Sequence, residues 1–347
     1  MSDPTPAERL AALIALYGPI SIAQFMAAAN AAYYGSRDPL GADGDFITAP
    51  EISQMFGEII GLWAAERVSR LSPAPHCVEP YYVELGPGRG TLAQDALRAA
   101  AKTGWTPDVH FVEMSAPLRA IQATRFPAAQ WHDTVDTLPT GAPLIIIANE
   151  LFDCLPIQQA IRAADGWHQR CVVHAGGDLF VPIPGKRIPD AVIPSEFADA
   201  PLGSILESCP SAVTILQALC ARLNTQGGAL LVIDYGYAGP ALGVTFQALR
   251  AHAYVNPFEK VGAQDVTAHV DFGTLAAAAV GAGCDVARLT SQGQWLIAHG
   301  IEARAEALRR AHPERAAEIA GQYARLTHSA QMGDLFKVLE VTAPGSA

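Results

Sequence analysis

The sequence predicts an α/β protein in which a parallel sheet is covered by helices on both faces. From residue 81 onward, apolar runs of strand length alternate with stretches of helical periodicity. Three of these runs are YYVEL (81–85), VHFVE (109–113) and PLIIIANELF (143–152), and the pattern between them predicts helices over about 91–103 and 116–125. Such alternation is typical of parallel strands joined by helical crossovers.

The chain before this core has a helical pattern. Residues 5–70 contain amphipathic runs at AERLAALIALYG and EISQMFGEIIGLWAAERVSRL. Between them, YYGSRDPLGADGDFITAP is too rich in Gly, Asp and Pro to continue a helix, so we expect an ordered loop anchored by Phe46 and Ile47. Pro73 and Pro75 then mark the boundary with the α/β core.

Three later segments complete the predicted architecture. Residues 160–200 alternate in hydrophobicity around a Gly turn, which predicts a hairpin insertion that projects from the core. GALLVIDYGY (228–237) predicts another buried strand. Residues 301–326 predict a helix interrupted near Pro313, and LFKVLEVTA predicts a closing strand.

Composition and charge limit the classes of function. The 347 residues are half apolar and carry a formal net charge of −11, which describes a compact protein of roughly two domains. The acidic balance disfavours a nucleic-acid surface, which needs clustered Lys and Arg. Nothing approaches the roughly 18 consecutive apolar residues of a membrane span, and the N-terminus lacks the pattern of a secretory signal.

The six cysteines show no CxxC pair and no grouping with histidine at metal-ligand spacing. We therefore expect reduced thiols in a cytoplasmic protein, and no metal site.

The stretch VELGPGRGTL carries the most chemical information. A strand that ends near Glu84, turns through three glycines and opens a helix at Thr91 brings backbone close to a ligand at a helix N-terminus. A phosphate-binding P-loop would need a GK[ST] ending, which is absent, and the NAD fingerprint GxGxxG would need a glycine at position 91. The spacing ExGxGxG is instead typical of enzymes that use S-adenosylmethionine, and its cofactor-binding candidates are Glu84, Gly86, Gly88 and Gly90. Because this donor is cationic and has no pyrophosphate, a carboxylate near it is favourable.

Two further acids follow the next strands. Glu113 ends VHFVE, where a carboxylate can accept hydrogen bonds from both ribose hydroxyls of a nucleoside. Asp133 lies in WHDTV, where it can accept a hydrogen bond from the adenine amino group. The alternative for each is a solvated acid at the end of a strand.

Several motifs in a fixed order extend this inference. GDFITAPEISQMFGE, VELGPGRGTL, NELFDCLP, LLVIDYGY, TAHVDFGTLA and QMGDLFKVL follow one another along nearly the whole chain. In these motifs the chain closely resembles the MidA-like family of class I S-adenosylmethionine-dependent methyltransferases, whose mitochondrial members are protein arginine methyltransferases that assist assembly of respiratory complex I. The family usually has NEFFDALP where this chain has NELFDCLP, and we interpret the departing Cys154 as a packing residue.

The resemblance implies a fold, a cofactor and a substrate. The cofactor is S-adenosyl-L-methionine, and the fold is a class I, Rossmann-like sheet of seven strands. An N-terminal helical cap with a cofactor and substrate loop spans 1–75, the methyltransferase core spans 76–160 and 212–347, and an insertion over 161–211 shapes the substrate groove. The implied partner is a protein, a peripheral-arm subunit of complex I, with symmetric dimethylation of an arginine.

The motif NELFDCLP contains the predicted catalytic residues Asn149, Glu150 and Asp153. They follow a buried strand at its carboxyl end, where open α/β sheets bind their ligands. A guanidinium is a poor nucleophile with a pKa above about 12, so its site needs carboxylates that hold its planar fork and accept a proton. We predict this role for Glu150 and Asp153, with a helix cap as the alternative for either acid. The amide of Asn149 would orient the donor or the substrate.

A second set of residues is predicted to line the same groove. Asp234 and Tyr235 end the strand GALLVIDYGY, and His269 and Asp271 lie in AHVDF. A histidine beside an aspartate is more often a structural pair than a catalytic base.

The N-terminal loop supplies a predicted lid. Asp45, Thr48 and Glu51 would close over the cofactor and shield the reacting centre from water. The alternative for Glu51, which follows Pro50, is an acid that stabilises a helix N-terminus.

Three functions stay open at the level of sequence. The first is a protein arginine methyltransferase, the second an assembly factor or chaperone that binds the cofactor without catalysis, and the third a small-molecule methyltransferase. The intact glycine motif, Glu113 and Glu150 favour catalysis, and the long segments outside the predicted sheet favour a large substrate.

Overall fold

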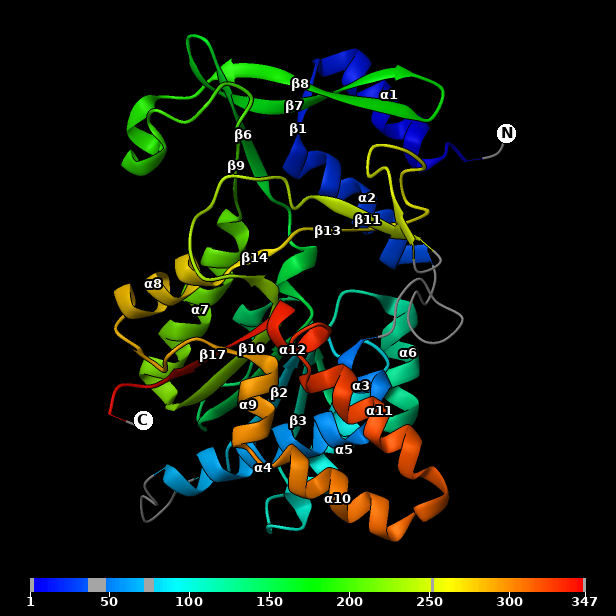
Figure 1. Ribbon diagram of the computed structural model, residues 1–347, viewed down its shortest axis with the longest axis vertical. Coiled ribbons are helices and arrows are strands. Elements are labelled where there is room, and N and C mark those ends of the chain that lie inside the picture. Colours follow the sequence, from blue (N-terminus) through cyan, green and yellow to red (C-terminus); the bar gives the residue numbers. More distant parts are fainter. Residues whose placement is uncertain (1–2, 37–47, 72–77, 251–252, 346–347) are drawn as a thin grey trace.

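A large mixed sheet with helices on both faces forms the middle and lower part of the molecule, and a smaller β-rich part lies above it (Figure 1). The computed structural model describes residues 3–36, 48–71, 78–250 and 253–345. The main sheet has the strand order β15-β17-β10-β5-β2-β3-β4, with β14 beside β10 and β16 beside β17. Its strands are β2 (Tyr81–Leu85), β3 (Val109–Val112), β4 (Gln130–His132), β5 (Leu144–Asn149), β10 (Gly228–Tyr237), β14 (Val270–Asp271), β15 (Asp285–Val286), β16 (Thr290–Ser291) and β17 (Phe336–Thr342).

The central strands are buried on both faces. All six residues of β5 are buried, and alternate side chains enter different cores: Ile145 and Ile147 lie in one cluster, and Leu144 and Ile146 in the other. This explains why β5 is a continuous run of branched apolar residues and shows no alternation with polar ones. The helices of this part are α3 (Ala49–Ile52), α4 (Gln54–Arg70), α5 (Thr91–Ala101), α6 (Ala116–Arg125), α7 (Pro210–Gln226), α8 (Phe272–Gly281), α9 (Gln292–Ala298), α10 (Ile301–Ala311), α11 (Ala316–Thr327) and α12 (Met332–Leu335).

The two faces of the main sheet carry different helices. Side chains of α4, α5, α9, α10 and α11 share the cluster that contains Ile145, in which the rings of Trp63 of α4 and Trp295 of α9 lie 6.4 Å apart. Side chains of α7 and α8, such as Leu216 and Leu275, share the other cluster. The predicted α/β class is therefore confirmed.

The upper part is built around a third apolar core. It contains α1 (Pro6–Tyr17) and α2 (Ile22–Ser36) from the N-terminus, together with two small sheets. Phe25 of α2 packs against Phe180 at a ring distance of 5.5 Å. One sheet comprises β1 (Ile20–Ser21), β6 (Gln158–Ala163), β7 (Gly166–Gly176), β8 (Leu179–Arg187) and β9 (Ile205–Ser208); the other comprises β11 (Gln247–Arg250), β12 (Ala253–Val255) and β13 (Asp265–Thr267).

The structure differs from the predicted architecture in strand number and direction. Within the described residues the main sheet has nine strands where seven were predicted: six longer strands and three of two residues each, β14 beside β10 and β15 and β16 beside β17. The closing strand β17 runs antiparallel to β10, so the sheet is mixed where the pattern predicted a parallel one. Hydrophobic alternation specifies which residues are buried and carries no information on strand direction.

The N-terminal segment also differs from its prediction. The expected helix over EISQMFGEIIGLWAAERVSRL is broken at Ser53, which has extended backbone angles of −161° and 138° and caps α4 by accepting a hydrogen bond from the amide of Met55. The helices of the predicted N-terminal cap belong to two different parts of the molecule. α1 and α2 belong to the upper core, whereas α4 packs on the main sheet.

Other predicted elements are confirmed with close bounds. The helix predicted over 116–125 is α6, and the strand predicted over 228–237 is β10. The predicted interruption near Pro313 separates α10 from α11, and the predicted hairpin is β7–β8. The loop predicted to be anchored by Phe46 and Ile47 lies outside the described residues.

Candidate functional site

The loops that follow β2, β3, β5 and β10 emerge at one edge of the main sheet. Leu85 of β2 is paired with Val112 of β3 and with Ala148 of β5, and Ile233 of β10 is paired with Asn149. Because these strands are parallel and in register, the residues that follow their carboxyl ends lie side by side. This places the glycine motif, Glu113, the segment 149–153 and Asp234 around one site.

The glycine motif forms a tight turn into α5. Gly86, Gly88 and Gly90 have φ angles of 64°, 54° and 77°, a region that favours glycine. A Cβ on Gly86 would lie 2.9 Å from the side chain of Leu151, and one on Gly90 would lie 2.7 Å from Phe126. The backbone angles therefore favour glycine at all three positions, and neighbouring side chains approach closely at Gly86 and Gly90.

Glu84 lies beneath this turn and is 3% exposed. Its Oε2 accepts a hydrogen bond of 2.7 Å from the hydroxyl of Tyr82. Burial raises the pKa of Glu84 to about 8, although the bond from Tyr82 opposes this shift. The carboxyl group is therefore largely neutral at pH 7, and its predicted contact with a cofactor stays a prediction.

Glu113 follows β3 and is joined to the glycine turn by a residue that no sequence motif indicated. Gln122 of α6 donates to the carbonyl of Gly88 at 2.7 Å and to Oε2 of Glu113 at 3.2 Å. The amide of Ser115 donates to the other carboxylate oxygen of Glu113 at 2.8 Å. Burial raises the pKa of Glu113, and these bonds oppose the shift. The carboxylate keeps acceptor capacity, because its two oxygens together can accept about four hydrogen bonds.

Asp133 follows β4 and has an exposed side chain. Its carboxylate pairs with Arg119 at 2.6 Å, and the same arginine donates to the carbonyls of Glu113 and His132. Arg119 thus ties the ends of β3 and β4 together.

Glu150 has an unusual backbone conformation for a residue other than glycine. Its φ is 52°, and within the described residues only Lys260 is a further case. The amide of Glu150 donates to the carbonyl of Ile233 at 2.9 Å, which holds the turn against β10. Such an outlier on a sheet edge that binds ligands is typical of a functional position.

The Glu150 carboxylate is partly buried and receives two hydrogen bonds at Oε1. The amide of Ala49 donates at 2.9 Å and the Asn149 side chain donates at 3.2 Å. Burial raises the pKa of Glu150 to about 7; the bond from Ala49 opposes the shift, and the charge of Asp153 adds to it. The charge of Arg325 on α11 lowers this pKa, so Arg325 is a nearby cation, one that the sequence pattern did not predict.

Asp153 and Asp234 form a buried acidic pair. They are 5% and 0% exposed. Oδ2 of Asp234 accepts hydrogen bonds from the amides of Phe152 and Asp153 at 2.9 and 3.2 Å, so Asp234 supports the turn that presents Asp153. Burial raises the pKa of both carboxyl groups, and the charges of Asp153 and Glu150 raise the pKa of Asp234 further. Tyr235 follows Asp234 on β10, and burial raises the pKa of its hydroxyl.

Two buried acceptors in this site have no hydrogen-bond partner in the described part of the chain. They are Oδ1 of Asn149 and Oδ1 of Asp153. A buried acceptor without a donor costs about 1–3 kcal/mol, so this arrangement suits a ligand that brings hydrogen-bond donors.

His269 and Asp271 have different environments. The ring of His269 lies edge-on to that of Tyr235 at 5.2 Å, and burial lowers the pKa of His269. Asp271 caps α8: its two oxygens accept from the amide of Thr274 at 3.0 Å and from the hydroxyl of Thr274 at 2.7 Å. The structure therefore brings His269 to the site and gives the Asp271 carboxylate a capping role instead of a place in the groove.

The described part of the predicted lid contacts the site from the N-terminal side. Thr48 precedes α3 and makes no side-chain cap. Glu51 accepts a hydrogen bond of 2.6 Å from the hydroxyl of Thr91, the first residue of α5, so it lies beside the glycine turn. Asp45 lies outside the described residues.

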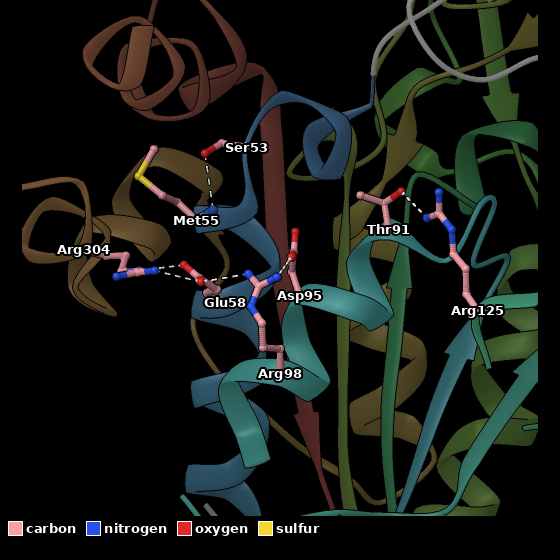
Figure 2. A network of polar contacts seen from close by, with 8 residues as sticks. All are labelled: Ser53, Met55, Glu58, Thr91, Asp95, Arg98, Arg125 and Arg304. Carbon is pink, nitrogen blue, oxygen red and sulfur yellow. Dashed lines mark hydrogen bonds and ion pairs between the residues drawn. The ribbon is translucent and has the colours of Figure 1, made fainter. Parts of the chain in front are cut away.

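A network of ion pairs braces the helix that begins at the glycine turn (Figure 2). Glu58 of α4 accepts from Arg304 of α10 at 2.6 Å and from Arg98 of α5 at 2.9 Å, and Arg98 also pairs with Asp95 at 2.7 Å. Burial alone would raise the pKa of Glu58, but the two arginines lower it below its ordinary value. Three helices are thereby held together behind the site.

Comparison with known proteins identifies relatives along most of the chain. A family of S-adenosyl-L-methionine-dependent methyltransferases matches residues 59–290. The mitochondrial protein arginine methyltransferase NDUFAF7 of Xenopus tropicalis is 33% identical over 93% of this chain and 82% of the relative. Its homologue in Drosophila melanogaster is 34% identical over 96% of this chain and 84% of the relative.

A solved structure has the same architecture. A COG1565 superfamily member from Burkholderia thailandensis, bound to S-adenosyl-homocysteine, is 26% identical and superposes with a TM-score of 0.83. The match covers 97% of this chain and 91% of that chain.

The comparisons correct the predicted location. The curated relatives are named as mitochondrial proteins, so the prediction of a cytoplasmic protein is wrong. Within the described residues, no helix combines the length and hydrophobicity needed to cross a membrane. No group of three or more potential metal ligands occurs in the same residues.

Proposed function

The chain belongs to a family of S-adenosyl-L-methionine-dependent methyltransferases, and we propose that it methylates an arginine side chain of a protein. The names of the curated relatives support a protein arginine substrate. The observation that carries the proposal is the acidic site at the end of β5, where Glu150 lies close to Asp153, whose buried Oδ1 has no donor in the described part of the chain. A guanidinium fits such a site, because it has five N–H donors in a planar fork and no acceptor.

The donor fits the residues at the ends of β2 and β3. S-adenosyl-L-methionine supplies a methyl group on a positively charged sulfur. The glycine turn brings backbone to the N-terminus of α5, and the Glu113 carboxylate keeps acceptor capacity for ribose hydroxyls. Glu84 and Asp133 complete the proposed donor contacts, and Thr48 and Glu51 lie at its N-terminal border. The unpartnered Oδ1 of Asn149 suits the donor's ammonium group.

Glu150 and Asp153 are the proposed residues that hold the substrate. Two carboxylates can grip the planar fork of a guanidinium through paired N–H···O bonds and draw its charge away from the reacting nitrogen. When that nitrogen takes the methyl group it must release a proton. Glu150, whose pKa is raised to about 7, is the proposed acceptor of this proton because it exchanges protons readily near neutral pH.

The upper part of the molecule is proposed to receive the protein substrate. Residues 161–211 form β7, β8, β9 and the end of β6, above the edge of the main sheet that carries the site (Figure 1). In accord with the resemblance described above, we propose a subunit of complex I as the substrate and symmetric dimethylation as the product.

Methyl transfer tests the proposal directly. The purified chain is incubated with complex I subunits and radiolabelled donor, and the hydrolysed product is analysed for methylarginines. We expect label in dimethylarginine. Label only in lysine, RNA or a small molecule would contradict the proposal.

Glu150→Gln tests the role of the central carboxylate. The substitution keeps size and the acceptor for Ala49 but removes the charge, so we expect turnover to be abolished while affinity for S-adenosyl-homocysteine changes by less than about tenfold, roughly 1.4 kcal/mol. Turnover is measured with the radiolabel and affinity by calorimetry. Glu302→Gln, an exposed position on α10, is the matched control. Near-normal turnover in Glu150→Gln would remove this residue from the mechanism.

A further inference from the structure

The C-terminal half of α2 directs two polar side chains toward the substrate side of the site. Asn30 and Tyr34 are four residues apart, so they share one face of the helix. Asn30 donates from Nδ2 to the carbonyl of Cys154 at 3.0 Å and to that of Val266 at 2.8 Å. The Tyr34 hydroxyl donates to Oδ1 of Asp265 at 2.8 Å and lies 3.1 Å from Sγ of Cys154.

These contacts complete the support of Asp153. The amide of Asp153 donates to Asp234, and its carbonyl accepts from the amide of Ala268 at 3.0 Å. Asn30 holds the carbonyl of the next residue, Cys154. The turn that carries Asp153 is therefore fixed by β10 on one side and by α2 and the segment before β14 on the other.

The Cys154 side chain links Tyr34 to the same turn. Its Sγ lies 3.1 Å from the Tyr34 hydroxyl, and its backbone carbonyl accepts the hydrogen bond from Asn30. Cys154 was predicted to be a packing residue, and the contact with Tyr34 gives its thiol a polar partner as well. Tyr34 thus contacts the residue that directly follows Asp153.

Tyr34 also reaches the donor side of the site. Its backbone carbonyl accepts a hydrogen bond of 3.0 Å from Oγ of Ser115, and the amide of Ser115 donates to the Glu113 carboxylate at 2.8 Å. Tyr34 is therefore linked through Ser115 to Glu113, the acid proposed to bind the ribose. On the other side it is linked through Cys154 to the adjacent Asp153, an acid proposed to bind the guanidinium.

We propose that Asn30 and Tyr34 are positioning residues that hold Asp153 in its substrate-binding orientation, and that Tyr34 couples this orientation to occupation of the donor site. The assignment of Asp153 and Glu113 rests on the proposed function. Neither α2 residue touches the reacting groups, so both act through the residues they hold. Burial raises the pKa of Tyr34 well above its ordinary value, so its hydroxyl stays protonated and remains a donor over the working pH range.

The coupling has a measurable consequence that needs no substrate. Binding of S-adenosyl-homocysteine should slow hydrogen exchange at the amides of Phe152 and Asp153, because donor binding steadies Glu113, Ser115 and Tyr34 in turn. Tyr34→Phe removes only the hydroxyl and keeps the ring that packs edge-on against Tyr33 at 5.1 Å. We expect the protection of these amides on ligand binding to be lost in Tyr34→Phe, with affinity for S-adenosyl-homocysteine within about twofold of the original.

Turnover provides the second readout. Tyr34→Phe and Asn30→Ala should each lower kcat by about tenfold with little change in the KM for the donor, because the alignment of the substrate is lost while donor contacts remain. In a double-mutant cycle with Cys154→Ala, the effect of Tyr34→Phe should shrink, since both changes remove the contact between the Tyr34 hydroxyl and the Cys154 thiol. Tyr17→Phe, an exposed tyrosine of α1, is the matched control and should change neither readout.

The outcomes separate this inference from the proposed function. Unchanged kcat, or the same protection by S-adenosyl-homocysteine in Tyr34→Phe as in the original chain, would overturn the inference. A parallel loss of kcat, donor affinity and exchange protection across the whole molecule would also overturn it, because it would indicate general destabilisation. If the original chain failed to methylate arginine, the proposed function would fail, and the exchange comparison would still decide the role of Tyr34.

Discussion

Glu150 illustrates how a single position combines backbone strain and charge. A left-handed φ of 52° costs a residue with a side chain on the order of 1 kcal/mol or more, and a half-buried carboxylate beside a second acid is also unfavourable. Both costs are offset by the hydrogen bond of its amide to Ile233 and by the bonds to its carboxylate from Ala49 and Asn149. The result is a carboxyl group that changes charge near neutral pH at the edge of the sheet.

This pKa predicts the pH dependence of activity. Glu150 has to be ionised to hold a guanidinium, and its pKa is raised to about 7, so the fraction of competent enzyme increases as pH rises through this value. We expect kcat/KM for the protein substrate to increase about tenfold between pH 6 and pH 8. The profile is measured at constant ionic strength with saturating donor. A rate that is flat over this range would show that another group controls the reaction.

The raised pKa of Glu84 predicts the direction in which stability changes with pH. Its pKa in the folded chain, about 8, is above that of an exposed glutamate, so the folded state binds the proton more tightly. The stabilising contribution is complete below about pH 4.5 and is lost as pH rises through about 8. Glu84→Gln keeps an acceptor for Tyr82 and cannot ionise, so it should equal the original chain at pH 5 and exceed it at pH 9. We expect a difference of a few kcal/mol at pH 9, because each tenfold change in proton affinity corresponds to about 1.4 kcal/mol.

Urea unfolding of the ligand-free protein at the two pH values measures this difference. The comparison between variant and original removes the contributions of the other buried acids. The same free-energy difference at both pH values would contradict the assigned pKa of Glu84.

At the scale of elements, α4 and α5 pack unusually closely behind the glycine turn. A Cβ on Gly61 would lie 2.1 Å from the carbonyl oxygen of Ala96, and one on Gly57 would lie 2.7 Å from Cβ of Asp95. These glycines, four residues apart on α4, allow the two helix backbones to approach. The same approach lets Glu58 reach Arg98, so close packing and the ion-pair network of Figure 2 depend on each other.

Gly61→Ala tests this packing. The added methyl group would meet backbone that cannot rotate away, so we expect a loss of at least about 2 kcal/mol in the free energy of unfolding. Gly321→Ala on α11 is the matched control, because nothing lies within 4 Å of its Cβ and alanine favours a helix by about 0.5–1 kcal/mol. Denaturant unfolding of both variants provides the comparison. A Gly61→Ala variant as stable as the original would show that the helices can separate freely.

At the scale of the whole molecule, the site joins parts of the chain that lie far apart in sequence. The glycine turn comes from β2, the acidic segment 149–153 from β5, and the supporting contacts from α2, α3 and β10. A ligand that occupies this site stabilises all of these parts at once, because it binds only when they are assembled.

Thermal unfolding with S-adenosyl-homocysteine tests this linkage. At about one hundred times its Kd the ligand should add about 2.7 kcal/mol of stability, which raises Tm by several degrees. Gly90→Ala should abolish the shift, because its Cβ would meet Phe126 at 2.7 Å and its φ is 77°. Gly18→Ala is the control, since Gly18 has a similar φ of 86° with nothing near its Cβ; it should lower Tm but keep the ligand shift. A full shift in Gly90→Ala would place the ligand elsewhere.

The amino-acid sequence alone determined the elements of the core and the residues that open its ligand edge. The bounds of α6 and β10, the turn through Gly86, Gly88 and Gly90, and the position of Glu150 after a buried strand all follow from local pattern. They could be predicted because apolar periodicity and the demand for glycine at positive φ act within a few residues.

Only the tertiary structure decided which distant residues support the site. Asn30 is 124 residues from the carbonyl it holds at Cys154 and 236 from that at Val266, so no local pattern links them. The antiparallel direction of β17 likewise did not follow from the local pattern. The physical reason is that a short-range pattern specifies which side chains are buried, whereas hydrogen-bond partners and strand direction depend on how the whole chain is packed.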